Sequence, residues 1–320
     1  MKSLAAALAA MALAACAGDD PSAKQAPALQ CEISLVVLGV AQDGGKPQTA
    51  NPDDPAWDDP TLQRLATSLA LVDRRDKDVR RWMFEATPDF KEQLQRLDRR
   101  APVERPIGLD GIFLTHAHIG HYAGLMLLGF ESVGAENVVV YAMPRMADFL
   151  AKNGPWSQLV SKHNIILAIM ADSEAESLSD GLAVTPFLVP HRQEFSEVVG
   201  YRIDGPERSA LFIPDIDSWE DWDREGTRIE DVIASVDIAY LDATFYADGE
   251  IPGRDMSGFP HPFVAHSMER FADLPDAEKA KIRFIHMNHT NPLLRPDAAE
   301  RAQVRDEGFK IAKEGEEVCL

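Results

Sequence analysis

Three histidines lie within six residues directly after an apolar run, and this cluster limits what the chain can fold into more than any other feature. The run at 111–114 leads through Thr115 to His116, His118 and His121, and a second apolar run follows at 125–130. Side chains two residues apart in a strand point to the same side, so we expect His116 and His118 to face one point at a strand end. A turn into a helix would bring His121 to that point. Imidazole is the commonest metal ligand in proteins, so the cluster predicts a metal site rather than a loop with three unrelated histidines.

The His-x-His-x-Asp-His signature of the metallo-β-lactamase-fold hydrolases resembles the segment THAHIGH at 115–121, in which Gly120 stands in place of the aspartate. Within that superfamily the mature chain is similar to the pyrroloquinoline quinone biosynthesis protein B branch, through VLG at 37–39, GGKPQ at 44–48, LDATF at 241–245 and NHTNP at 288–292. The resemblance implies an α/β (α+β) fold, the four-layer αββα sandwich, with all metal ligands at one edge. The alternation of predicted strands and helices favours the same class.

The resemblance also implies metal ligands further along the chain. His191 follows a predicted strand and occupies the place of the third histidine of the superfamily. Asp215 closes the next strand and matches the aspartate that bridges two metals, with Asp217 as its rival for that role. His289 matches the last ligand histidine. His286, three residues earlier in a predicted strand, points to the opposite side by alternation and is expected to be structural.

Two ligand groups result, namely His116 with His118 and His191, and His121 with His289 and Asp215. The first group leaves a fourth position for water, as catalytic zinc sites do. The second group lacks a carboxylate because of Gly120. We therefore expect one tightly bound zinc and a second that is weaker or absent unless Asp217 or water substitutes. A Gly120→Asp variant should then bind closer to two metals per chain. Iron or manganese is also compatible with histidine and carboxylate ligands.

Four side chains are candidates for orienting a ligand or lining a substrate pocket: Asp217, Asp242, His261 and Asn291. Asp242 ends a buried strand, where it either accepts the second N–H of a ligand histidine or caps the following turn. The stretch 41–60 is rich in glycine and proline and is predicted to be an irregular loop. Related folds place this loop at the mouth of the metal site, where it either gates the site or is a plain surface loop.

The expected chemistry is hydrolysis of a small molecule. Bound metal lowers the pKa of its water towards neutral, and the resulting hydroxide attacks an ester, lactone, amide or phosphodiester, with Asp215 as the catalytic carboxylate. Two other functions stay open. One is an iron-dependent oxidative enzyme, as the relatives in quinone cofactor biosynthesis imply, and the other is a lipoprotein that binds a metal or ligand without catalysis.

The N-terminus predicts export. Lys2 precedes an apolar run at 4–13 that is too short to span a bilayer, and Leu13-Ala14-Ala15-Cys16 resembles a bacterial lipobox. We expect a signal peptide at 1–15, a lipid on Cys16 that anchors the protein at the periplasmic face of a membrane, and a flexible tether at 16–30. One domain at 31–320 follows.

Cysteine usage and charge bear on compartment and partners. If Cys16 is lipidated, Cys31 and Cys319 remain at the two ends of the domain, and in an oxidising compartment we expect them to form a disulfide rather than stay unpaired. The 52 acidic and 32 basic side chains give a formal net charge of −20. That charge repels polyanions, so we expect no nucleic-acid partner and membrane contact only through the lipid anchor.

Overall fold

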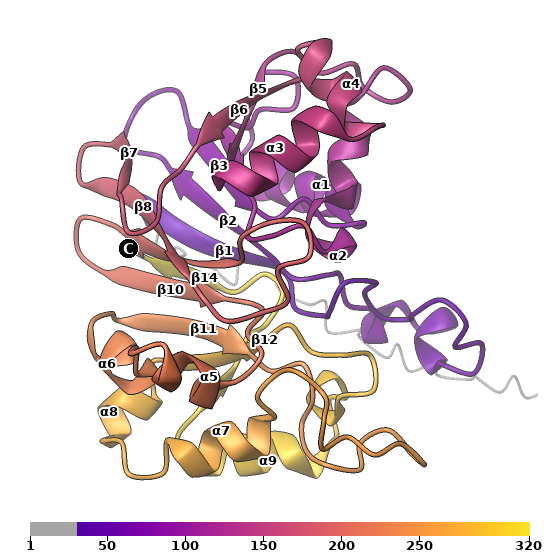
Figure 1. Ribbon diagram of the computed structural model, residues 1–320, viewed down its shortest axis with the longest axis vertical. Coiled ribbons are helices and arrows are strands. Elements are labelled where there is room, and N and C mark those ends of the chain that lie inside the picture. The colour runs from indigo at the N-terminus through magenta and orange to yellow at the C-terminus, as the bar shows by residue number, and fades with distance from the viewer. Residues whose placement is uncertain (1–30) are drawn as a thin grey trace, which may run out of the picture. The chain divides into compact units, whose positions relative to one another are not determined.

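Two seven-stranded sheets pack face to face in this protein, and helices cover the outer face of each sheet (Figure 1). The computed structural model describes residues 31–320, so the predicted signal peptide, the tether and Cys16 lie outside the described residues. The four layers confirm the predicted αββα sandwich. No helix within residues 31–320 is long and apolar enough to cross a membrane.

Both sheets are mixed, with the strand orders β14-β1-β2-β3-β4-β5-β6 and β13-β12-β11-β10-β9-β8-β7. The first sheet consists of β1 (Ile33–Gly39), β2 (Ser68–Asp73), β3 (Arg80–Phe84), β4 (Gly111–Phe113), β5 (Val138–Ala142), β6 (Ile165–Ile169) and β14 (Glu317–Cys319). The second consists of β7 (Glu176–Ser179), β8 (Leu182–Leu188), β9 (Val199–Asp204), β10 (Ser209–Ile213), β11 (Ile238–Asp242), β12 (Ile282–Ile285) and β13 (Lys310–Ile311).

The helices divide between the two outer layers (Figure 1). The first sheet carries α1 (Phe90–Arg100), α2 (Ile119–Tyr122), α3 (Pro144–Lys152) and α4 (Trp156–Ser161). The second carries α5 (Trp219–Arg224), α6 (Ile229–Ala234), α7 (Val264–Arg270), α8 (Asp276–Lys279) and α9 (Ala299–Asp306). The loop predicted at 41–60 is irregular apart from two short 3-10 turns, η1 (Pro55–Trp57) and η2 (Pro60–Leu62).

Strand β1 explains why the first sheet is covered on both faces. All seven of its residues are buried, and successive side chains of a strand point to opposite faces. Leu35 and Val37 belong to the core between the two sheets. Val36 and Leu38 belong to the second core, beneath α1–α4. An uninterrupted apolar strand is thus buried by two different layers.

The strand directions gather polar loop residues at one edge of the sandwich. β10, β11 and β12 run parallel to one another, so Asp215, Asp242 and His286 lie at the same end of the sheet. β3 and β4 are also parallel, and Glu85 and the histidine cluster follow them. A bridge between Ala41 and Met287, together with the hydrogen bond from the Val199 N–H to the Thr115 carbonyl (3.2 Å), joins the two sheets at this edge.

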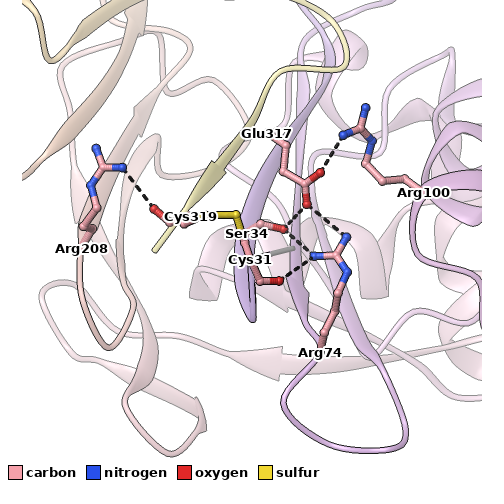
Figure 2. Close-up of a disulfide and its surroundings, with 7 residues drawn as sticks. All are labelled: Cys31, Ser34, Arg74, Arg100, Arg208, Glu317 and Cys319. Carbon is pink, nitrogen blue, oxygen red and sulfur yellow. Dashed lines mark hydrogen bonds and ion pairs between the residues drawn. A yellow bond between two sulfur atoms is a disulfide. The ribbon is translucent and has the colours of Figure 1, made fainter. Parts of the chain in front are cut away.

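The first and last strands are neighbours, and a disulfide joins them (Figure 2). Cys31 is bonded to Cys319 with their Cα atoms 5.2 Å apart, within the usual range. Glu317 of β14 accepts a hydrogen bond of 2.7 Å from Ser34 and pairs with Arg74 and Arg100 at 3.1 and 2.6 Å. The two ends of the domain are therefore held by covalent, polar and main-chain contacts together.

Replacing both Cys31 and Cys319 with serine should lower the free energy of unfolding by about 4 kcal/mol, because the bridge closes almost the whole domain into one loop. Denaturant unfolding of oxidised, reduced and variant protein measures this, and the reduced protein should match the variant. Thiol labelling of unreduced, unfolded protein followed by peptide mapping should find no label at these two positions. Labelled Cys31 or Cys319 would contradict the bridge.

Candidate metal centre

Three histidine nitrogens from two strand ends meet at one point. The Nε2 atom of His116 lies 2.8 Å from the Nδ1 atom of His118, and the Nε2 atom of His191 lies 3.2 Å from that same atom. A tetrahedral zinc with Zn–N bonds of 2.0–2.1 Å would separate its nitrogen ligands by roughly 3.4 Å, so a small outward shift makes room for an ion. His116 and His191 are buried, whereas 21% of the His118 side chain is exposed. The point therefore has access to solvent on the His118 side.

Two of these histidines hold their outer ring nitrogen against a carboxylate. The Nε2 atom of His118 lies 3.1 Å from Glu194, and the Nδ1 atom of His191 lies 2.8 Å from Asp217. A neutral imidazole has one N–H and one lone pair, so these contacts place the hydrogen outside and the lone pair towards the shared point. Asp217 thus orients His191. The sequence analysis named Asp217 as a substitute for the carboxylate missing at Gly120, but Asp217 does not supply a carboxylate to the second ligand group.

The third histidine is oriented through a threonine. The Nδ1 atom of His116 lies 2.8 Å from the Thr115 hydroxyl, which donates a hydrogen bond of 2.6 Å to the buried Glu85 carboxylate. Because that hydroxyl uses its hydrogen for Glu85, it accepts the N–H of His116. The lone pair on Nε2 of His116 is therefore also directed at the shared point. All three imidazoles have the tautomer that a metal requires.

A second set of side chains lies next to the first. The Nε2 atom of His121 lies 2.8 Å from Oδ2 of Asp215 and 3.2 Å from Oδ1 of Asp43. The Nε2 atom of His286 lies 3.5 Å from Oδ2 of Asp215. The same oxygen lies 3.6 Å from Nε2 of His116. Asp215 therefore lies between the two groups, where the sequence resemblance puts a bridging aspartate.

His286 is oriented in the same way as His116. Its Nδ1 atom lies 3.1 Å from the Thr244 hydroxyl, and that hydroxyl donates a hydrogen bond of 2.7 Å to Asp242. The hydroxyl therefore accepts the N–H of His286, which leaves the Nε2 lone pair directed at Asp43 and Asp215. A buried carboxylate behind a threonine thus fixes one histidine in each group.

The prediction that His289 completes the second group while His286 is structural is wrong. β12 ends at Ile285, and His286 has a left-handed backbone with a φ of 65°, so strand alternation does not extend over these residues. His289 is instead at the wall of a cleft of about 760 Å³, together with Lys46 and Arg295. It belongs to none of the groups of three or more potential ligand side chains within residues 31–320.

The remaining candidates surround the second group. Asp242 both caps its turn, through the N–H of Thr244 at 2.9 Å, and accepts a hydrogen bond of 2.8 Å from Nδ1 of His261. Burial lowers the pKa of His261, but the Asp242 carboxylate more than compensates and raises it to about 9. Asn291 donates to the Ala243 carbonyl at 2.8 Å and caps the turn that begins at Pro292. Asn291 therefore supports the loop behind the site.

The electrostatics of the cluster favour a bound cation. Burial lowers the pKa of His116 and of His118, so both imidazoles are neutral at neutral pH. Burial would raise the pKa of Asp215, but the neighbouring His286 and His121 hold it well below its usual range. Burial lowers the pKa of His121, yet the Glu85 and Asp215 carboxylates raise it well above its ordinary value. These buried carboxylates require positive charge, which a protonated His121 provides and which a bound metal would provide in its place.

Sequence reasoning missed Asp43, Glu85, Glu194 and the two threonines. Asp43 lies in the loop that was expected near the site, but no spacing singled it out among the acidic residues of that loop. Glu85 directly follows β3, and the sequence indicated only the strand itself, with nothing to mark this carboxylate as functional. Asp43, Glu85, His261 and His286 all have a positive φ, from 27° to 83°. Unusual backbone of this kind concentrates at functional sites, and it is visible only in the structure.

Comparison with known proteins supports the family resemblance. A model of the beta-lactamase superfamily domain matches residues 80–298. Coenzyme PQQ synthesis protein B of Xanthomonas axonopodis pv. citri is 28% identical over 318 residues, which cover 90% of this chain and all of the relative. The protein of the same name from Cupriavidus necator is 27% identical over 318 residues, covering 90% of this chain and 99% of the relative.

Solved structures agree on the fold. Zn(2+)-bound PqqB from Methylobacterium extorquens has a TM-score of 0.72 at 24% identity, and the match covers 90% of this chain and 100% of that one. A diphosphatase from the PhnP family has a TM-score of 0.61 at 23% identity, with 90% and 98% covered. The fold is thus shared with proteins whose names point to different reactions.

Proposed function

Because the chain belongs to the metallo-β-lactamase superfamily, we propose that it is a metal-dependent hydrolase that binds zinc through His116, His118 and His191 and cleaves an ester, lactone, amide or phosphodiester of a small molecule. The observation that carries this proposal is the orientation of the three imidazoles. Each outer nitrogen contacts an oxygen of Thr115, Glu194 or Asp217. Three convergent lone pairs with an open fourth position are the arrangement of catalytic zinc.

A divalent metal at this point would lower the pKa of a water molecule and polarise a carbonyl or phosphoryl oxygen. The surrounding side chains would orient the water and hold the metal ligands in place. Asp215 is buried, and its low pKa keeps it ionised, so its carboxylate would accept a hydrogen bond from the attacking water and orient it. Glu85 and Asp217 hold His116 and His191 in place, which preserves the site when a substrate enters from the exposed side of His118.

A second candidate is an iron-dependent oxidative enzyme. Relatives 27–28% identical over the full domain bear the name coenzyme PQQ synthesis protein B, and histidine and carboxylate ligands also suit iron. The predicted signal peptide and lipidated Cys16 favour the hydrolase, because we infer a lipoprotein on the periplasmic face, away from cytoplasmic biosynthesis. A small-molecule substrate is part of the same proposal.

The test is metal analysis of protein purified without added metal, followed by reconstitution and a panel of chromogenic esters, lactones and phosphodiesters. We expect zinc-supported turnover. His116→Ala should weaken zinc binding by more than about 100-fold, since even the partners of ligands contribute 10- to 100-fold, and should reduce turnover to background. His266→Ala, an exposed histidine on α7, is the matched control. Iron as the only metal found, with oxygen consumption and no hydrolysis, would favour the oxidative enzyme.

A further inference from the structure

We propose that Asp43, in the loop after β1, is the carboxylate ligand of a second metal position, with His121, His286 and Asp215 as the other ligands. The signature segment would place such a carboxylate at position 120, where this chain has glycine. The inference rests on the metal binding in the proposed function and does not depend on which reaction the site performs.

The four side chains converge. Oδ1 of Asp43 lies 3.2 Å from Nε2 of His121 and 3.7 Å from Nε2 of His286. Oδ2 of Asp215 lies 2.8 and 3.5 Å from the same two nitrogens. Two imidazoles and two carboxylates around one point form a donor set suited to zinc, iron or manganese. Within residues 31–320, Asp43 is the carboxylate grouped with both His121 and His286, and Asp215 also contacts both nitrogens.

The atoms that face this point lack hydrogen-bond partners in the described part of the chain. Oδ1 of Asp43, Nε2 of His121 and Nε2 of His286 are each buried, and none makes a hydrogen bond. Their separations are short, yet their geometry is wrong for hydrogen bonds with one another. Buried polar atoms are rarely left in this state. A cation that accepts their lone pairs accounts for all three at once.

This arrangement requires glycine at position 120 for steric reasons. A Cβ atom at this position would lie 2.3 Å from Oδ1 of Asp43 and 2.6 Å from its Cα. The second contact is with the backbone, so no rotation of Asp43 relieves it. Gly120 lies in α2, and its φ is not in the left-handed region, so backbone conformation does not demand glycine. A side chain at 120 and Asp43 at the site exclude each other.

The loop that carries Asp43 is fixed against the segment that carries His286. The N–H of Gln42 donates to the Met287 carbonyl at 2.8 Å, and Asn288 donates to the Gln42 side chain at 2.6 Å. Asp43 and His286 are therefore held opposite each other by neighbours on both sides. This placement revises the expectation of a weak second site, and Gly120→Asp should displace Asp43 instead of adding a ligand.

Two variants test the proposal by different routes. Asp43→Asn keeps the shape and removes the charge, and Gly120→Ala leaves Asp43 intact but forces its loop outward. After equilibrium dialysis at fixed free zinc, we expect two zinc ions per native chain and close to one in each variant, with the second site at least about tenfold weaker. Cobalt absorption spectra of the same proteins should lose the bands of one site only. Asp58→Asn, an exposed aspartate of the same loop, should retain two.

The double variant Asp43→Asn/Gly120→Ala should lose no more zinc than either single variant, because both changes remove one interaction. Native-like binding of two zinc ions by Asp43→Asn would overturn the role of Asp43 while leaving the hydrolase proposal intact. A native chain that binds a single zinc ion would also overturn it. A native chain that binds no metal would instead contradict the proposed function.

Discussion

Asp215→Asn should reduce turnover by roughly 1,000-fold and weaken metal binding at both positions. One oxygen of Asp215 lies 2.8 Å from His121 and 3.6 Å from His116, so its negative charge faces both ligand groups. The amide keeps the shape but removes the charge that offsets repulsion between two cations. Several kcal/mol of charge stabilisation correspond to three or more powers of ten in rate. Steady-state kinetics and metal content, measured on the same preparation, test this.

Asp217→Asn is the matched control, because Asp217 lies two residues further along the same loop. Its carboxylate contacts the outer nitrogen of His191 at 2.8 Å, and an asparagine oxygen in that place still accepts the N–H. We expect an effect of about tenfold, near the lower end of what such partners contribute, and only on the first metal. Equal losses in the two variants would contradict the special role of Asp215 in connecting the two sites.

The first ligand group could be predicted from the sequence because each of its histidines comes shortly after a strand. His116 and His118 follow β4, and His191 follows β8. The apolar run that ends in histidines indicated the first two, and His191 was identified only when the family resemblance was added to its position after a strand. Asp215 was separated from Asp217 by the same reasoning, since it lies closer to the end of β10. The sandwich itself was predictable from the alternation of strands and helices and from the family resemblance.

The second group was not accessible, for two physical reasons. His286 and His289 lie beyond the end of β12, where a positive φ at His286 changes the direction of the chain, so the period of a strand no longer says which side chain faces the site. Asp43 replaces a residue 77 positions away in sequence, through a contact that only the folded structure reveals. When a ligand is supplied from a distant loop in this way, no motif near the histidine cluster indicates it.

Buried polar residues in strands were missed for a related reason. Among them, Arg81 has an expected effect on stability that is as large as the effect of the disulfide. Its side chain is fully buried, and it donates hydrogen bonds to the Gly108 and Ala101 carbonyls, each at 2.8 Å, and to Asp98 at 2.7 Å. These contacts fix the segment between α1 and β4, directly before the histidine cluster. Sequence periodicity predicts only that the strand is apolar, and it does not reveal a guanidinium inside.

Arg81→Ala should lower the free energy of unfolding by about 3–5 kcal/mol, because it leaves buried carbonyls without donors and opens a cavity. Denaturant unfolding measures the loss, and Arg99→Ala, an exposed arginine on α1, should change it by less than about 0.5 kcal/mol. Metal content per folded chain should stay unchanged, since Arg81 contacts no candidate ligand. A loss of metal at unchanged stability would mean that the segment positions the histidines rather than supporting the fold. A loss below about 1 kcal/mol would mean that water replaces the guanidinium at these carbonyls.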